Sequence, residues 1–414
     1  MKSLRLFILI SALVVWSSAS ATNGYFNHGY GTMSQGMAGA GAAWSQCSIA
    51  VSTNPAGMAF VDNRLDVGLE WFSPRREYEV TGGTSTPPPG TFYLQPGKVR
   101  SGSEHFFIPT FGYNHHLGNN QTLGLTIYAN GGMNTDYSHS TFYAGNTGVN
   151  LEQLFISPSW TFRFGDQQSV GVAPVIAYQR FNAKGLASFA PFSSNPAALS
   201  NKGRSNSWGY GINLGWQGKV MDGLRAGVSW RSRIYMSKLH RYRGLFAEQG
   251  GFDIPMTVNA GLAWQFTGNQ HLLLDMQHVW YSQVKSVGNP MLPGLVQHQL
   301  GDKNGAGFGW RDMTTWKLGW QWDQSDKQSW RAGISYGRQP IPKKEVLFNI
   351  LAPGVQEWHF TGGFTHRFEK FELSGMVFYS PTKSVSGENP LGPGQRITLR
   401  MHQFGAALSL GWKF

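Results

Sequence analysis

The chain has 414 residues, of which only 14% are charged and 14% are aromatic, and its formal net charge is +12. Average chains carry about 25% charged residues, so the composition argues against an ordinary soluble domain. The basic residues are dispersed and form no long run, so the sequence lacks the usual signature of a nucleic-acid-binding protein. The single cysteine, Cys47, excludes an internal disulfide and is expected to be a small buried thiol.

The first 21 residues have the features of a secretory signal peptide. Lys2 and Arg5 precede an apolar run over 6–16, and the small residues at 19–21 offer a cleavage site. The apolar run is too short for a helical membrane span, which needs about twenty residues, and no later run reaches that length. We therefore expect a mature chain that begins at Thr22, and we exclude a helical membrane protein.

Residues 22–62 form a segment without strand periodicity. Gly36–Ala43 is a run of small residues that allows close backbone packing. Trp44–Ser52 is expected to form a short helix that ends before Asn54-Pro55, because proline disfavours a helical conformation in the residue before it.

From Asn63 to Phe414 apolar and polar residues alternate with a period of two. The last segment places Phe404, Leu408 and Trp412 on one face, with Gln403 on the other. About fourteen such segments of about ten residues follow one another, which is the length that a tilted strand needs to cross a bilayer. Their connections alternate between short turns and long loops, as in outer-membrane barrels, where the short turns are periplasmic.

These patterns predict an all-β fold, a transmembrane antiparallel β-barrel of about 14 strands, with residues 63–414 as the barrel. A lumen of this width is too large for its own side chains to fill. We therefore expect residues 22–62 to form a hatch, or plug, inside the lumen, after a signal peptide over 1–21. The chain is expected in the outer membrane of a Gram-negative bacterium. Its expected partners there are outer-membrane lipid, lipopolysaccharide near a basic rim, and the barrel-assembly machinery, through the strand that ends in Phe414.

The N-terminal segment resembles a known family. Asn23-Gly-Tyr-Phe26, the run YGTMSQGMAGAGAAW over 30–44 and the motif Asn54-Pro55-Ala56-Gly57 are similar to the hatch of the outer-membrane long-chain fatty acid transporter (FadL) family, which also includes transporters of aromatic hydrocarbons. The resemblance extends over the whole chain. At Cys47 the sequence departs from the family, whose members often carry an acidic residue there.

The resemblance implies passive uptake of a hydrophobic molecule by capture among the loops, passage to an inner pocket, hatch movement and lateral exit beside a kinked third strand. Tyr25 and Phe26 would lie near the inner pocket. The third strand, Leu123–Tyr137, contains Gly131 and Gly132, whose pairing within a strand indicates a bulge or a broken ladder, unless it is an ordinary approach to the rim.

Two further sets of candidate residues follow from the residues themselves. Exposed hydrophobic residues on long loops suit a capture surface, although they would also suit loop self-packing; they are Leu186, Phe189, Phe192, Leu245 and Phe246. Basic residues at inward positions could bind a carboxylate, or pair with Asp66, Glu70 and Asp275 on the same face; they are Arg163, Arg225, Arg231, Arg233, Lys317 and Arg331.

Long-chain fatty acids are the preferred substrate class, and aromatic or aliphatic hydrocarbons are the alternative, because a hydrocarbon needs the hatch but no cation. A general porin would lack a forty-residue plug. An outer-membrane hydrolase would have to use Gly333-Ile-Ser-Tyr-Gly337, but that motif requires a strand–turn–helix and here lies within a strand pattern. The twelve histidines show no metal-binding spacing, so we expect no catalytic residue, no metal and no cofactor.

Overall fold

The computed structural model describes residues 22–414 except 85, 87 and 166, so the expected signal peptide lies outside the described residues. Within that described part, no helix combines the length and the apolar character of a membrane-spanning helix.

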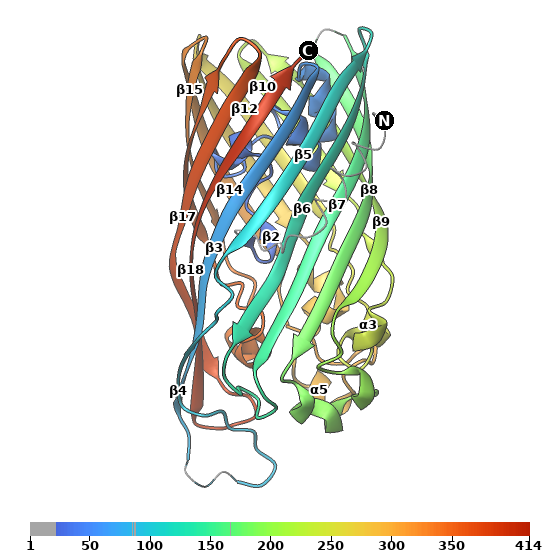
Figure 1. Cartoon of the computed structure of the whole chain (residues 1–414), viewed down its shortest axis with the longest axis vertical. Helices are drawn as coiled ribbons and strands as arrows, with labels where there is room; N and C mark the ends of the chain where they lie inside the picture. Colours follow the sequence, from blue (N-terminus) through green and yellow to red (C-terminus); the bar gives the residue numbers. More distant parts are fainter. Residues whose placement is uncertain (1–21, 85, 87, 166) are drawn as a thin grey trace, which may run out of the picture.

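Fourteen long antiparallel strands of the described chain close into a barrel (Figure 1). The closing pair is β3 with β18, in a continuous register from Arg64↔Lys413 to Gly82↔Gln395. The fourteen are β3 (Arg64–Gly82), β5 (Phe106–Leu117), β6 (Gln121–Tyr137), β7 (Thr147–Phe164), β8 (Gln168–Lys184), β9 (Ser205–Met221), β10 (Leu224–Arg231), β12 (Thr257–Thr267), β13 (Gln270–Val279), β14 (Met313–Ser325), β15 (Gln328–Gly337), β16 (Trp358–Arg367), β17 (Phe371–Glu388) and β18 (Gln395–Lys413). The predicted fold class is confirmed.

The sequence alternation matches the two faces of this barrel. Leu408 is 58% exposed on the outer face, whereas Gln403 on the same strand is fully buried on the lumen side. Large apolar side chains such as Trp71, Trp208 and Trp316 are exposed on the outside, as a wall that contacts lipid requires. The period of two therefore reports which side of the wall each residue faces.

Short elements lie in the lumen or in the loops. The small strands are β1 (Thr22–Asn23), β2 (Phe26–Asn27), β4 (Gly97–Arg100) and β11 (Tyr235–Met236). The helices are α2 (Thr32–Gln35), η2 (Ser48–Ser52), η3 (Pro55–Phe60), η4 (Ala187–Phe192), η5 (Pro196–Ala198), η6 (His240–Tyr242), α3 (Ala247–Gly250), η7 (Tyr281–Gln283), α4 (Lys285–Gly288), α5 (Gly294–Gln297), η8 (Lys343–Glu345) and α6 (Val346–Asn349).

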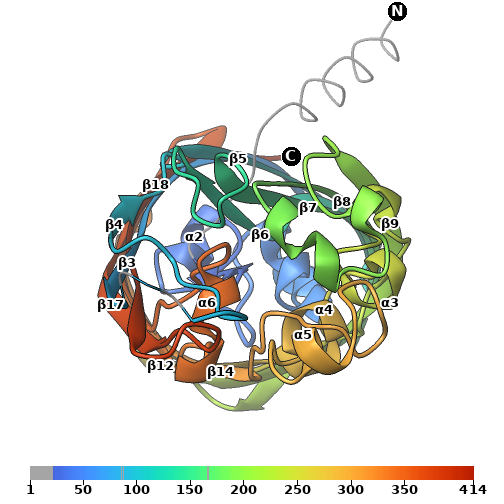
Figure 2. The ribbon, with the colours of Figure 1, turned by 90° about the horizontal axis from the view of Figure 1, so that it is seen from below.

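The two ends of the barrel differ. Short turns and the C-terminus lie at the upper end in Figure 1, where the N-terminal segment occupies the lumen. The long loops with α3, α4, α5 and α6 crowd the opposite end, which Figure 2 shows from below. Because short turns face the periplasm in outer-membrane barrels, the N-terminal segment lies at the periplasmic end and the long loops are extracellular.

The Asn54-Pro55-Ala56-Gly57 motif begins a helix as well as following one. The expected helix over 44–52 is shorter, covering only Ser48–Ser52, and a second helix starts at Pro55. The Asn54 side chain caps that second helix by accepting a hydrogen bond from the Ala56 amide at 3.1 Å. Asparagine is a favoured N-cap and proline fits the first helical position because its missing N–H is not needed there, so the expectation of a simple helix stop was incomplete.

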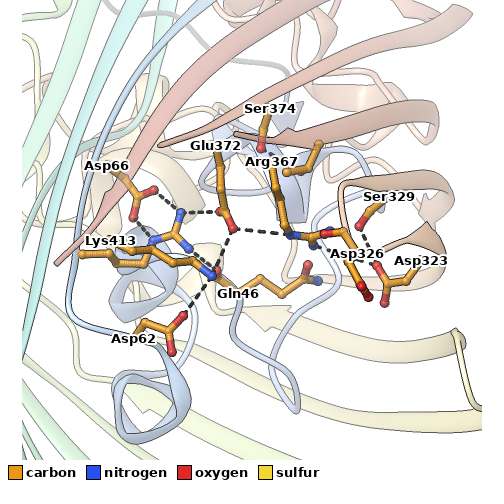
Figure 3. Close-up of polar contacts among 12 residues, drawn as sticks. Gln46, Asp62, Asp66, Asp323, Asp326, Ser329, Arg367, Glu372, Ser374 and Lys413 are labelled. Carbon is orange, nitrogen blue, oxygen red and sulfur yellow. Dashed lines mark hydrogen bonds and ion pairs between the residues drawn. The ribbon is translucent and has the colours of Figure 1, made fainter. Parts of the chain in front are cut away.

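A buried polar cluster joins the hatch to the closing strands at the periplasmic end (Figure 3). Arg64 forms ion pairs with Asp66 at 2.6 Å and with Glu372 of β17 at 3.0 Å, and it donates to the backbone oxygen of Gln46 at 3.3 Å. Lys413 of β18 reaches the same Glu372 at 3.2 Å. One guanidinium thus connects the first strand, a neighbouring hairpin and the hatch.

We predict that Arg64→Gln lowers stability strongly. The substitution leaves the buried Asp66 without its cation, while Glu372 keeps Lys413 and Arg367. Breaking a buried ion pair in this way costs about 3–5 kcal/mol. The loss is measured as a lower temperature for the folded-to-unfolded mobility shift of the barrel in detergent gels. Arg396→Gln, at an exposed position of β18, is the control and should melt as the unchanged protein does. Equal melting of both variants would contradict the role given to Arg64.

Candidate functional site

An apolar cavity lies among the extracellular loops. Side chains from four loops line it. Leu186 and Phe189 contribute from the β8–β9 loop, and Leu245 and Phe246 from the β10–β12 loop. Among the described residues no charged side chain lines it; the other lining residues are Val149, Phe181, Leu199, Ser286, Leu300, Ala306, Gly307, Phe308, Phe348 and Leu351. The cavity therefore suits an apolar ligand, and its lining offers no ion-pair partner for a charged group of a ligand.

A series of aromatic rings leads from this cavity to the hatch. Phe246 lies 4.9 Å from Phe252, measured between ring centroids, and Phe252 lies 6.3 Å from Tyr25. Tyr25 contacts Phe26 at 5.0 Å and Tyr281 at 5.3 Å. All five rings are buried. The rings thus form a packed series from the loop cavity to the start of the hatch, and we call its hatch end, Tyr25 and Phe26, the aromatic floor.

Arg231 places a cation beside this floor. Its guanidinium carbon lies 5.1 Å from the ring centroids of both Phe26 and Phe155. Nη1 donates to Asn130 Oδ1 at 3.1 Å and Nη2 to Thr257 Oγ1 at 3.2 Å, while the buried Nε has no hydrogen-bond partner in the described structure. None of the described carboxylates forms an ion pair with it. The unused Nε of this buried guanidinium is a donor to which a ligand carboxylate could bind.

Tyr30 of the hatch completes the polar rim around Arg231. Its hydroxyl donates toward Asn130, at 3.0 Å from Oδ1 and 3.1 Å from the backbone oxygen. Burial raises the pKa of Tyr30 above its usual value, and Arg231 opposes part of that rise. The phenol therefore stays neutral at physiological pH and acts as a hydrogen-bond donor.

Next to this floor, β6 leaves its neighbour β5 and pairs with the hatch. The β5–β6 register runs only as far as Phe111↔Ile127. Beyond it, Gly131 pairs with Phe26 of β2, and the Gly132 amide donates to the Tyr25 carbonyl at 3.0 Å. The segment that leads into β5 contacts β6 again where the Gly102 amide donates to the Asp136 carbonyl at 2.7 Å. We call the interval between these two joints the β5–β6 window; β2 lies behind it in Figure 1.

Gly131 is required for this arrangement. A Cβ atom at position 131 would lie 1.9 Å from the Tyr25 carbonyl oxygen, a distance that no side chain tolerates. The register of β6 against β7 also shifts between Ala129 and Gly131, as at a β-bulge. Close backbone approach thus explains why the sequence has a glycine at this point of a spanning strand.

Carboxylates of the barrel wall fasten the hatch. Asp275 Oδ2 accepts hydrogen bonds from the Gly41 and Ala42 amides, both at 2.8 Å. Glu70 Oε2 accepts from Gln35 Nε2 at 2.7 Å, and Asp66 Oδ2 accepts from the Ser48 amide at 2.8 Å. The acidic residues on the lumen face therefore bind the hatch backbone and side chains.

Two of the candidate cations also bind the hatch and do not reach the aromatic floor. Lys317 Nζ donates to the His28 carbonyl at 2.9 Å, and Arg331 Nη2 donates to Gln46 Oε1 at 2.9 Å. The Asn54 side chain acts in the same way, with Nδ2 donating to the Ala42 carbonyl at 2.7 Å and to the Trp216 carbonyl at 2.9 Å. The hatch is held by many short polar contacts to the wall.

The remaining candidates lie elsewhere. Arg163 and Arg225 flank the ring of Phe60 at the end of the hatch, at 5.8 and 4.3 Å from its centroid. Arg233 forms an ion pair with Asp253 at 2.7 Å. Phe192 is 40% exposed and is not part of the cavity lining. The structure thus brings together Tyr25, Phe26, Arg231, Gly131 and Gly132, and separately the four cavity residues Leu186, Phe189, Leu245 and Phe246.

Sequence reasoning missed Tyr281, Trp310 and Arg76. Tyr281 and Trp310 lie in the long β13–β14 loop and contact Tyr25 at 5.3 and 5.9 Å between centroids. Loop residues have no periodicity that would place them, so only their aromatic character could have drawn notice. Arg76 occupies an inward position of β3 and could have been found by the same parity argument that selected the other lumen cations.

Comparison with known proteins adds to this geometry. The profile of the family described as outer membrane protein transport protein (OMPP1/FadL/TodX) matches residues 12–374. A long-chain fatty acid transport protein of Salmonella typhi is 21% identical over 405 residues, covering 89% of this chain and 88% of the relative. A 47 kDa outer membrane protein of Pasteurella multocida is 23% identical over 395 residues, covering 87% of each chain.

Solved structures have the same fold. A Pseudomonas aeruginosa FadL homologue superposes with a TM-score of 0.71 at 17% identity, covering 94% of this chain and all of that one. The Pseudomonas putida toluene transporter TodX gives a TM-score of 0.68 at 16% identity, covering 94% of this chain and 99% of that one.

The chain belongs to the OMPP1/FadL/TodX family. It is an outer-membrane transport protein. The family resemblance given by the N-terminal motifs is confirmed, and so is the expected location in the outer membrane.

We predict that Gly131→Ala disturbs the floor of the route in this family member. The added methyl group would displace the Tyr25 carbonyl and with it β2, so affinity for a bound hydrophobic ligand should fall at least about tenfold, or about 1.4 kcal/mol. Gly268→Ala is a matched control, because nothing lies within 4 Å of a Cβ atom there. Isothermal titration or fluorescence displacement in detergent measures both. Unchanged affinity in Gly131→Ala would show that β2 does not shape the site.

We further predict that Cys47 reports movement of the hatch. It is the only cysteine of the chain and is buried. Burial raises its pKa to about 12, so at pH 8 only about one thiol in ten thousand is the reactive thiolate.

Maleimide labelling, followed by mass spectrometry, should therefore be at least about 100-fold slower in the folded protein than in urea. A ligand that displaces the hatch should accelerate it. Labelling of the folded protein at the unfolded rate would contradict a closed hatch.

Proposed function

We propose that this protein takes up hydrophobic small molecules passively across the outer membrane, with long-chain fatty acids as the preferred class. The continuous apolar route carries the proposal: a ligand enters the loop cavity, follows the rings of Phe246 and Phe252, and reaches Tyr25 and Phe26. Because Tyr25 and Phe26 belong to the hatch and pair with β6, a ligand that displaces them also loosens the β5–β6 window. It then leaves sideways into the membrane.

Arg231 supports a carboxylate as the polar end of the ligand. It lies at the end of the aromatic route, is 4% exposed, and has an unused Nε donor. A guanidinium held between two aromatic faces has lost hydrogen bonds to water. A carboxylate that binds there would supply hydrogen-bond acceptors in place of that water. The relatives named for long-chain fatty acid transport agree with this choice.

Aromatic or aliphatic hydrocarbons are the second candidate. The loop cavity has an uncharged lining, which suits a neutral hydrocarbon as well as a fatty acyl tail. Structural neighbours of this chain include a protein named as a toluene transporter. For such a ligand Arg231 would contribute little.

The proposal contains no catalytic step, no metal and no cofactor. Ser335, the serine of Gly333–Gly337, lies inside β15, whereas a nucleophile elbow needs a turn into a helix. A general porin is disfavoured because residues 22–62 occupy the lumen (Figure 2).

We further propose lipid and assembly partners at the outer surface. Arg75, Arg100 and Arg400 on β3, β4 and β18 each form an ion pair with Glu104 or Glu77, and the N–H donors that these pairs leave over would bind the phosphate groups of lipopolysaccharide. Phe414, 63% exposed at the end of the chain, suits recognition by the barrel-assembly machinery.

Equilibrium binding of a long-chain fatty acid, its methyl ester and toluene to the purified protein tests this function. We expect the acid to bind more tightly than the ester, and Arg231→Gln to weaken acid binding about 10- to 100-fold while the ester changes less than about threefold. Equal binding of acid, ester and toluene by the unchanged protein would favour the hydrocarbon candidate. Absence of binding of all three would contradict the proposed function.

A further inference from the structure

Arg76 lies on the lumen side of the β5–β6 window. It projects from β3 and is 6% exposed. Its Nη1 donates to the Ser103 carbonyl at 3.2 Å, and its guanidinium carbon lies 5.7 Å from the ring centroid of Phe106. Ser103 and Phe106 lead into and begin β5. The arginine therefore lies at the β5 edge of the window.

This guanidinium has no counter-charge. In the described part of the chain the bond to Ser103 is its only hydrogen bond, and no acidic side chain forms an ion pair with it. The adjacent Arg75, by contrast, is paired with Glu104, and Arg64 on the same strand is paired with Asp66. A buried charge without a partner is costly, and an arginine carries five N–H donors. The site is built to accept an anion that the protein itself does not supply.

A small inner cavity lies beside Arg76. It is also lined by Tyr25, Gly132, Met133 and Trp310. Tyr25 belongs to the floor of the uptake route, so this cavity is the next space beyond that floor. A ligand that displaces Tyr25 meets Arg76.

An open polar groove also borders the window, and we call it the outer groove. Its lining includes Glu104, His105, Asp136 and Lys184. Asn134 lines both this groove and the inner cavity. The two spaces are therefore neighbours that share Asn134 as a boundary.

The window is apolar along one part and polar along the other. Phe106, Ile108 and Ala129 pack in one buried apolar cluster where the β5–β6 register ends. The polar groove includes His105, which stacks on Trp71, a 37% exposed residue of the outer face. Tryptophan on the outer face of a barrel favours the level of the lipid headgroups. The window thus suits a molecule with an apolar tail and a polar head.

We propose that Arg76 is a carboxylate-binding residue of the β5–β6 window. It holds the anionic head of a single-chain amphiphile as the molecule moves from the inner cavity to the outer groove. This inference rests on the proposed function and adds a second cation with a separate role. Arg231 binds the acid at the end of the aromatic route and sets affinity; Arg76 acts at the exit and sets the relative rates of passage for charged and neutral ligands.

The test is the initial uptake of a labelled long-chain fatty acid and of its methyl ester. Both are measured in Gram-negative cells that lack their own long-chain fatty acid channel and express the unchanged protein, Arg76→Met or Arg76→Lys. We expect Arg76→Met to lower acid uptake at least about tenfold and ester uptake less than about twofold. Arg76→Lys keeps the charge and should retain at least about a third of the acid uptake. Arg76→Gln replaces Arg76→Met if that variant does not assemble, which the gel-mobility shift of the folded barrel reports.

A purely structural role, in which Arg76 only anchors Ser103, predicts that acid and ester uptake fall together in Arg76→Met. That result overturns the proposal, as does equal uptake of both ligands by the variant and the unchanged protein. If the unchanged protein takes up neither ligand, that result contradicts the proposed function itself and, with it, the carboxylate-binding role of Arg76.

Discussion

The backbone pairing between Phe26 and Gly131 is the contact on which the rest of the structure depends. It takes β6 away from β5, places the start of the hatch under the loop cavity, and leaves a window in the wall. A closed barrel has no sheet edge, so an opening in its side requires that one strand pair with something else. Here the hatch supplies that alternative partner, and the same residues that close the route from the loops border the side opening.

The remainder of the hatch is held by different chemistry. Asp66, Glu70 and Asp275 accept hydrogen bonds from it, and Lys317 and Arg331 donate to it. These contacts are buried, so breaking one without replacing it is costly. The N-terminal floor combines ring packing and one short strand pair with hydrogen bonds from Asn23 to Gln277 at 3.0 Å and from Tyr281 to the Asn23 carbonyl. In the proposed uptake, a ligand displaces this floor while the polar contacts of the remaining hatch keep the lumen blocked.

The barrel could be predicted well from the sequence because the patterns that indicate it are local along the chain. Alternation and the difference between turns and loops depend only on residues close in the chain, as the outward Leu408 and the inward Gln403 illustrate. The site was harder to predict. Lumen parity identified six cations but could not tell Arg231, which lies at the aromatic floor, from Lys317 and Arg331, which hold the hatch, because the difference depends on where a plug without periodicity folds. The glycines at 131 and 132 indicated a break in the strand, and only the structure shows that Phe26 takes the vacated place.

The most direct test of this account is photo-crosslinking with a fatty acid that carries a photoreactive group on its tail, followed by peptide mapping of the purified protein in lipid vesicles. The account predicts adducts on peptides that contain Phe246 and Phe252, on the segment with Tyr25, and on the segments bordering the window near Phe106 and Gly131. Adducts on the loop peptides and on the periplasmic turn after β9, without any at the window, would contradict lateral exit and point to passage through the hatch.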